Sequence, residues 1–149
     1  MKIIFKEARI EDLENLLTLV YKFYEIGPAD VLAEKLKTSV IELIANPQYG
    51  KAWLISVDNY IAGYIVLTFG FSIEYNGRDA LVDEFFIDEL YRGKGIGKKA
   101  LEFVTEYSKN NGINSIHLEV KEKHNKTKKL YEREGFIKHN SLFMTKKLF

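Results

Sequence analysis

Apolar positions in the first third of the chain follow a helical period. Between residues 11 and 25 the apolar side chains share one helix face. They are Leu13, Leu16, Leu17, Val20 and Tyr24. A second helical face begins near Val31 and ends at Asn46-Pro47, and Gly27-Pro28 separates the two helices. Because residues 3–5 form a short apolar run ahead of them, the pattern predicts strand–helix–helix.

The pattern changes to that of strands after residue 50. The apolar runs 52–57, 61–69 and 81–87 are separated by turn-forming residues, Asp58-Asn59 and then Tyr75-Asn76-Gly77. Consecutive strands joined by short turns predict an antiparallel meander.

The last third returns to helices and strands in alternation. A helix is predicted from Ile96 to about Lys109, a strand at 116–120, a helix at 125–134 and the last strands at Phe136 and 142–148. The order β-α-α-β-β-β-α-β-α-β predicts an α/β (α+β) fold with a mixed sheet and helices on both faces. We expect residues 1–149 to form a single domain.

Charge and composition exclude several classes of function. The 149 residues carry 22 Lys and Arg against 21 Asp and Glu, which leaves no charge excess for nucleic acid or an anionic membrane. The absence of cysteine excludes disulfides, thiolate metal ligands and a cysteine nucleophile. The three histidines are scattered, and we predict no metal site. No apolar run approaches the roughly 20 residues of a membrane span, so we predict a cytoplasmic protein without membrane or nucleic-acid partners.

A glycine-rich turn between a strand and a helix is the most informative segment. Its residues are Arg92, Gly93, Lys94, Gly95, Ile96, Gly97 and Lys98. Glycines let the backbone approach a ligand, and N–H groups at a helix start converge on an anion such as pyrophosphate. A Walker loop is excluded because Lys99 follows Gly97-Lys98, and the dinucleotide fingerprint fails because Lys98 stands where its third glycine belongs. The alternative is a turn that is glycine-rich only for tight packing.

Two segments together resemble the GNAT superfamily of N-acetyltransferases. Arg92, Gly95 and Gly97 match its Arg/Gln-x-x-Gly-x-Gly/Ala turn. Residues 125–136 are similar to its Asn-x-x-Ala-x-x-Leu-Tyr-x-x-x-Gly-Phe block, except that Lys128 replaces the small residue. The flanking pattern of helices and strands extends this resemblance over the whole chain.

The resemblance implies direct transfer of an acetyl group from acetyl-CoA to an amine, without a metal. It implies that pantetheine pairs with Phe85-Phe86-Ile87, where this strand splays from 116–120, and that the Phe85 N–H binds the acetyl carbonyl. Asn125 would bind the pantetheine arm. The lysine-rich run 121–129, which includes Lys128, is read from its residues as a solvated face, with contact to the phosphates of coenzyme A as the alternative. The Tyr131 hydroxyl would protonate the departing thiolate, although a tyrosine in that seam also fits simple packing. Homodimers are common in the family.

Asp83 and Glu84 are candidates for the base that removes the amine's proton. Because neighbouring residues on a strand face opposite ways, we expect only one of them to reach the amine. Asp83 should face the same side of the strand as Phe85 and Ile87, which favours Asp83 as the base. The alternative is a structural hydrogen-bond acceptor or a solvated edge.

Several fragments are similar to the spermidine/spermine and thialysine acetyltransferase subgroup. They are Tyr24-Glu25, residues 71–78 and residues 83–86. This resemblance implies a small acceptor such as a polyamine or an amino-acid-like amine, with Tyr24, Glu25, Glu74 and Tyr75 binding it. The alternative is that these four are ordinary surface residues. The alternatives are an enzyme that acetylates a protein N-terminus or lysine, and a non-enzymatic acyl-CoA-binding module.

Overall fold

A five-stranded mixed sheet organises the first part of the chain. The computed structural model describes residues 1–149 as two units, 1–119 and 120–149, and each is described by itself. The first unit contains β1 (Ile3–Glu7), α1 (Leu13–Tyr24), α2 (Val31–Ala45), β2 (Gly50–Val57), β3 (Tyr60–Ser72), β4 (Gly77–Ile87), α3 (Ile96–Asn110) and β5 (Ile113–His117). Single 3-10 turns, η1 (Ile10–Asp12) and η2 (Glu89–Tyr91), precede α1 and follow β4.

The strands lie in the order β1-β2-β3-β4-β5. The first four pair antiparallel, and β5 pairs parallel with β4 through the α3 crossover. Asp58 and Asn59 join β2 to β3 with φ of 49° and 71°, left-handed values that these two residue types tolerate. The predicted meander and mixed sheet are therefore confirmed.

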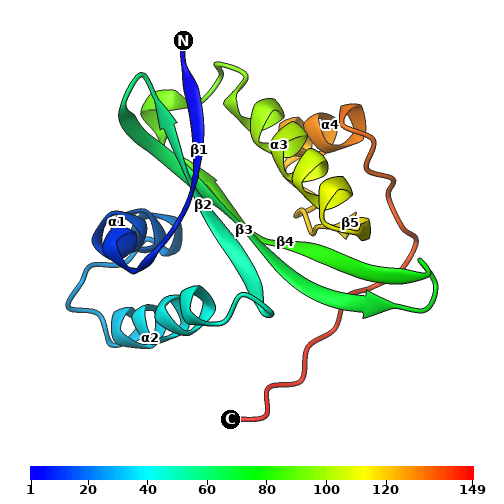
Figure 1. Ribbon diagram of the computed structural model, residues 1–149, viewed down its shortest axis with the longest axis horizontal. Coiled ribbons are helices and arrows are strands. Elements are labelled where there is room, and N and C mark those ends of the chain that lie inside the picture. Colours follow the sequence, from blue (N-terminus) through cyan, green and yellow to red (C-terminus); the bar gives the residue numbers. More distant parts are fainter. The chain divides into compact units, whose positions relative to one another are not determined.

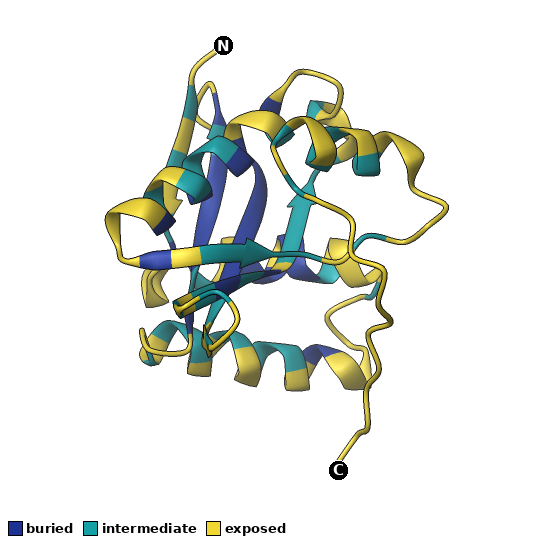
Figure 2. Cartoon of the chain, turned by 90° about the vertical axis from the view of Figure 1, so that its right-hand side faces the viewer, coloured by how far each residue is buried: buried dark blue, intermediate teal, exposed yellow.

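Helices cover both faces of this sheet (Figure 1). The buried layer under α1 and α2 includes Leu16, Leu19, Val20, Leu54, Tyr64 and Val66. The layer under α3 includes Trp53, Ile65, Leu67, Ile96, Ala100 and Val104. Along β3, Tyr64 and Val66 face one layer and Ile65 and Leu67 the other, because successive side chains point to opposite faces. Figure 2 shows the buried residues gathered in the central strands.

The position predicted for the strand at 116–120 is wrong by three residues. β5 begins at Ile113 because Gly112, with φ of 70°, turns the chain directly after α3, and Ile113 pairs at once with Arg78. It ends at His117, which pairs with Leu81, the last residue of β4 to have a partner on β5.

The second unit contains one helix, α4 (Asn125–Arg133). Gly135, with φ of 93°, ends it, and the Gly135 N–H donates to the Glu132 carbonyl. The last strands predicted at Phe136 and 142–148 do not form, and the apolar side chains of 142–149 are exposed. An apolar pattern predicts a strand, but a strand also needs a neighbouring edge for its backbone hydrogen bonds.

None of the helices combines the length and the apolar character needed to cross a membrane.

Candidate active site

The open edge of β4 is the first component of the site. Pairing with β5 stops at Leu81, where β5 itself ends at His117, whereas β4 continues to Ile87, so the last residues of β4 have no strand partner on that side. The Asp88 N–H donates to the Ala62 carbonyl at 2.8 Å, and ladder bonds of antiparallel pairs fall on alternate residues. Phe86 therefore bonds to β3, whereas the backbone groups of Phe85 and Ile87 face the open side.

The glycine turn after β4 presents unpaired N–H groups. Gly93 and Gly95 have φ of 74° and 80°, and Gly95 is the N-cap residue directly before α3. No side chain caps this helix, no acidic residue lies in its first turn, and no acceptor within the chain pairs with the N–H groups of residues 93–98. Unpaired amides and the positive helix end together suit an anion.

Side chains around this turn divide into two kinds. Arg92 is engaged with β4: its Nε donates to the Ile87 carbonyl at 2.7 Å, and its guanidinium carbon lies 5.6 Å from the Phe86 ring centre. Lys94 and Lys98 are exposed cations beside the turn. Ile96 is buried and anchors the first turn of α3 in the core.

A β-bulge in β4 places the two predicted acidic residues. Val66 pairs with Glu84 and Leu67 pairs with Val82, so Asp83 has no partner of its own on β3. A bulge interrupts the strict alternation of faces. Burial and the adjacent Glu84 raise the pKa of the Tyr24 and Tyr64 hydroxyls, and the charge of Asp83 adds a smaller contribution. The alternation argument that favoured Asp83 over Glu84 does not apply, because the register shifts between Val82 and Glu84, whereas Glu84 and Phe85 share one register.

Glu84 is held by two tyrosines from different elements. One carboxylate oxygen accepts from the Tyr24 hydroxyl and the other from the Tyr64 hydroxyl, at 2.9 Å in the second case. Burial raises the pKa of Glu84, and these two hydrogen bonds oppose part of that rise. Partial desolvation raises the pKa of Asp83, which remains exposed. The bulge thus carries two carboxylates that bind protons more readily than ordinary ones.

The residues predicted to bind the acceptor do not form one cluster in residues 1–119. Tyr24 contacts Glu84, and exposed Glu25 follows it at the end of α1 with φ of 56°. Glu74 and Tyr75 lie instead in the turn between β3 and β4, where Tyr75 packs on His117 with ring centres 5.1 Å apart. The strand from that turn to Glu84 spans on the order of 20 Å, too far for one small amine to contact both ends.

The second unit holds the remaining predicted residues. The Tyr131 ring packs edge-on against Phe136 with centres 5.8 Å apart, and burial raises the pKa of its hydroxyl. Asn125 is exposed at the start of α4. Lys128 donates to a Glu122 carboxylate oxygen at 3.0 Å, so this lysine is already paired.

Tyr64 is the site residue that sequence reasoning missed. It lies in the apolar run of β3, where the sequence pattern predicts a core residue, and it is fully buried. One signal was available: a buried tyrosine hydroxyl usually needs a hydrogen-bond partner. The identity of that partner depends on the pairing of β3 with β4.

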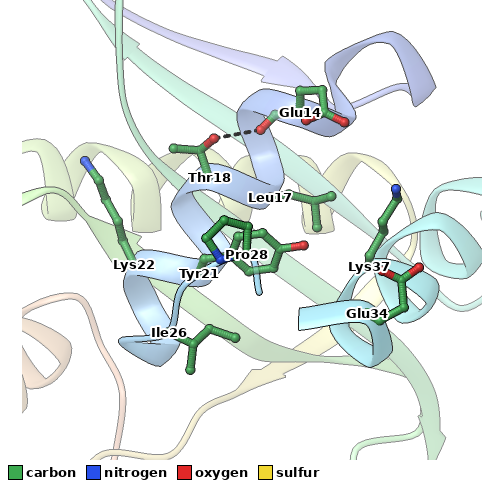
Figure 3. Close-up of a pocket in the computed structure, with 9 residues that line it drawn as sticks. All are labelled: Glu14, Leu17, Thr18, Tyr21, Lys22, Ile26, Pro28, Glu34 and Lys37. Atoms are coloured by element: carbon green, nitrogen blue, oxygen red, sulfur yellow. Dashed lines mark hydrogen bonds between the residues drawn. The ribbon is translucent and has the colours of Figure 1, made fainter. Parts of the chain in front are cut away.

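A separate surface pocket lies between α1 and α2 (Figure 3). Its lining residues are Glu14, Leu17, Thr18, Tyr21, Lys22, Ile26, Pro28, Glu34 and Lys37. None of the predicted site residues lines it. The structure contains no group of three or more His, Cys, Asp and Glu side chains that could hold a metal ion.

Comparison with known proteins identifies the class. The sequence profile of the acetyltransferase (GNAT) family matches residues 11–136. The chain belongs to this family and is an acetyl-CoA-dependent N-acetyltransferase.

Three similar proteins illustrate the range of relatives. A thialysine N-epsilon-acetyltransferase of Mus musculus is 30% identical over 141 residues, which cover 87% of this chain and 81% of the relative. A spermine/spermidine N(1)-acetyltransferase of Bacillus subtilis is 40% identical over 62 residues, 41% of this chain and 40% of the relative. The crystal structure of an integron cassette protein from the mobile metagenome of Cole Harbour Salt Marsh superposes with a TM-score of 0.84 at 30% identity, covering 97% and 90% of the two chains.

Substituting Gly95 tests the turn. A Cβ there meets nothing within 4 Å, so the cost of Gly95→Ala comes from its positive φ, about 1–2 kcal/mol of stability. Relaxation of that φ turns the amides away from their common focus. We expect acetyl-CoA affinity, measured by isothermal titration, to fall about tenfold. Gly27→Ala is the control, since Gly27 also has free space but no positive φ. Equal binding by both variants would show that the turn does not hold the ligand.

Proposed function

We propose that the protein acetylates the primary amine of a small cationic molecule, a polyamine or an amino-acid-like amine. The observation that carries this proposal is the pair of carboxylates on the β4 bulge, bordered by aromatic rings, next to the open strand edge. Carboxylates and aromatic faces are the groups that recognise an alkylammonium ion. The similarity to thialysine and spermine/spermidine acetyltransferases supports the same class of acceptor.

In this proposal, backbone groups bind acetyl-CoA, the acetyl donor. The open edge at Phe85 and the Ile87 N–H pair with the amides of pantetheine as an added strand would, since the Ile87 carbonyl already accepts from Arg92. The Phe85 N–H donates to the thioester carbonyl, and the turn from Arg92 to Lys98 binds the pyrophosphate. Asn125 contributes to binding the pantetheine arm. Lys128 reaches phosphate only by leaving Glu122.

Proton transfer uses three side chains in this proposal, Glu84, Asp83 and Tyr131. The acceptor arrives as an ammonium ion, and Glu84 takes one proton so that the nitrogen can attack the carbonyl carbon. The nitrogen loses its second proton to Asp83 or water as the tetrahedral adduct collapses and the C–S bond breaks. The Tyr131 hydroxyl donates a proton to the departing sulfur and is reprotonated by solvent. One proton is released overall. A tyrosine whose pKa is raised by burial remains a proton donor at neutral pH.

A panel of acceptors tests the substrate class. Release of free CoA thiol is measured with acetyl-CoA and spermidine, a lysine analogue or short peptides. We expect turnover with the small amines, because the carboxylates and aromatic rings at β4 match a compact cation. Turnover confined to peptides would move the acceptor class to protein N-termini or lysines. Tight acetyl-CoA binding without turnover on any amine would favour a non-enzymatic module.

The isosteric variants Glu84→Gln and Asp83→Asn separate the two carboxylates. We expect Glu84→Gln to lower kcat by about 10²–10⁴-fold, the usual worth of a general base. Asp83→Asn should cost about tenfold through loss of a nearby negative charge. In the wild type, kcat/KM should fall as pH drops through the raised pKa of Glu84, since protonation disables the base. The reverse order of effects would assign the base to Asp83.

Replacing Tyr131 tests the acid. Tyr131→Phe keeps the ring against Phe136 and removes only the proton donor. We expect kcat to fall about 10²-fold while acetyl-CoA affinity stays unchanged. Tyr49→Phe, at an exposed tyrosine, is the matched control. A Tyr131→Phe enzyme as fast as the wild type would remove the acid role.

A further inference from the structure

Two tyrosine hydroxyls, one from a strand and one from a helix, hold the Glu84 carboxylate. Tyr64 belongs to β3, the strand paired with β4 beside the bulge, and Tyr24 is the last residue of α1. Each hydroxyl donates to a different oxygen of the same carboxylate. Two donors on two oxygens prevent the carboxylate plane from rotating and leave further lone pairs on both oxygens free.

The two tyrosines differ in how firmly they are fixed. The Tyr64 ring is fully buried and lies near Phe23 and Phe86, with ring centres 6.3 and 6.2 Å away. The hydroxyl is the one polar group of the Tyr64 side chain, and leaving it unpaired in the core would cost stability. Tyr24 is 38% exposed and packs edge-on against Phe23. Tyr64 is therefore the rigid donor and Tyr24 the donor at the rim.

The charge of Glu84 is not neutralised by a cation of residues 1–119. Lys22, on the same helix as Tyr24, pairs with Asp88 at 2.7 Å, and Arg92 donates to the Ile87 carbonyl. The other charged group that acts on Glu84 is the Asp83 carboxylate, which is of like sign. Neutral donors therefore fix the orientation of Glu84 while leaving its full negative charge for an incoming ammonium ion.

We propose that Tyr64 and Tyr24 are positioning residues, with Tyr64 the dominant one, which hold Glu84 oriented and ionised for proton transfer from the acceptor amine. This inference rests on the proposed role of Glu84 as the base. A lysine in the place of Tyr64 would hold the carboxylate equally well but would cancel the charge that attracts the substrate.

The test measures the ionisation of Glu84 directly and then its effect on catalysis. The Glu84 carboxyl is titrated by its ¹³C chemical shift in the wild type, Tyr64→Phe, Tyr24→Phe and the control Tyr60→Phe. Tyr60 is an exposed tyrosine on the same strand as Tyr64. A hydroxyl that donates to the carboxylate stabilises its charged form, so its removal raises the titration midpoint. We expect a rise of about one pH unit in Tyr64→Phe, a smaller rise in Tyr24→Phe and none in Tyr60→Phe.

Catalysis should follow the same shift. The acid limb of kcat/KM should move upward by the same amount in Tyr64→Phe, with acetyl-CoA affinity unchanged. Adding Tyr64→Phe to Glu84→Gln should cost no further activity, because a positioning residue acts only through its partner. Thermal unfolding of each variant checks that the fold is intact.

The outcomes separate the two proposals. A slow Glu84→Gln enzyme combined with an unshifted Glu84 titration in Tyr64→Phe would overturn the positioning role and leave the base in place. A fully active Glu84→Gln enzyme would overturn both. An equal loss from Tyr64→Phe in the wild-type and Glu84→Gln backgrounds would show that Tyr64 acts only through packing.

Discussion

The parting of β4 from β5 is the constraint on which the site depends. A parallel pair that stays in register satisfies every backbone group and leaves no edge for a ligand. Here the pairing ends at Leu81 while β3 continues to support β4 as far as Ile87. The strand is thus held rigidly on one side and left open on the other. The glycine turn and the start of α3 follow directly from this open end.

The bulge at Asp83 adds chemistry to the same strand. Without it, Asp83 and Glu84 would face opposite sides of the sheet, and only one would belong to the site. The extra residue brings Asp83 within electrostatic reach of the tyrosines that hold Glu84, and regular pairing with β3 resumes at Glu84. In the proposed mechanism, one strand therefore supplies backbone groups for acetyl-CoA and carboxylates for the acceptor amine.

The proposed mechanism binds its two substrates with different kinds of group. A pyrophosphate needs fixed positive potential, and here the unpaired amides of residues 93–98 offer it without side-chain ordering. An ammonium ion needs a negative charge that can also take a proton. Burial raises the proton affinity of Glu84, and neutral hydroxyls keep it oriented. The rings of Phe23 and Phe86 pack near Tyr64 and lower the local polarity. Low polarity strengthens both the rise in the proton affinity of Glu84 and its hydrogen bonds to the hydroxyls.

The sequence by itself determined what depends on neighbouring residues. The helices α1, α2, α3 and α4, the β2–β4 meander and the turn at Gly93 and Gly95 follow from local periodicity, glycine spacing and turn residues. Tertiary structure decided what depends on pairing between segments: the bulge at Asp83, the start of β5 at Ile113, and the partnership of Tyr64 with Glu84. It also separated Glu74 and Tyr75 from Tyr24, and it left residues 142–149 without a strand partner. Strand register is a relation between distant parts of the chain, whereas an apolar period is a property of one segment.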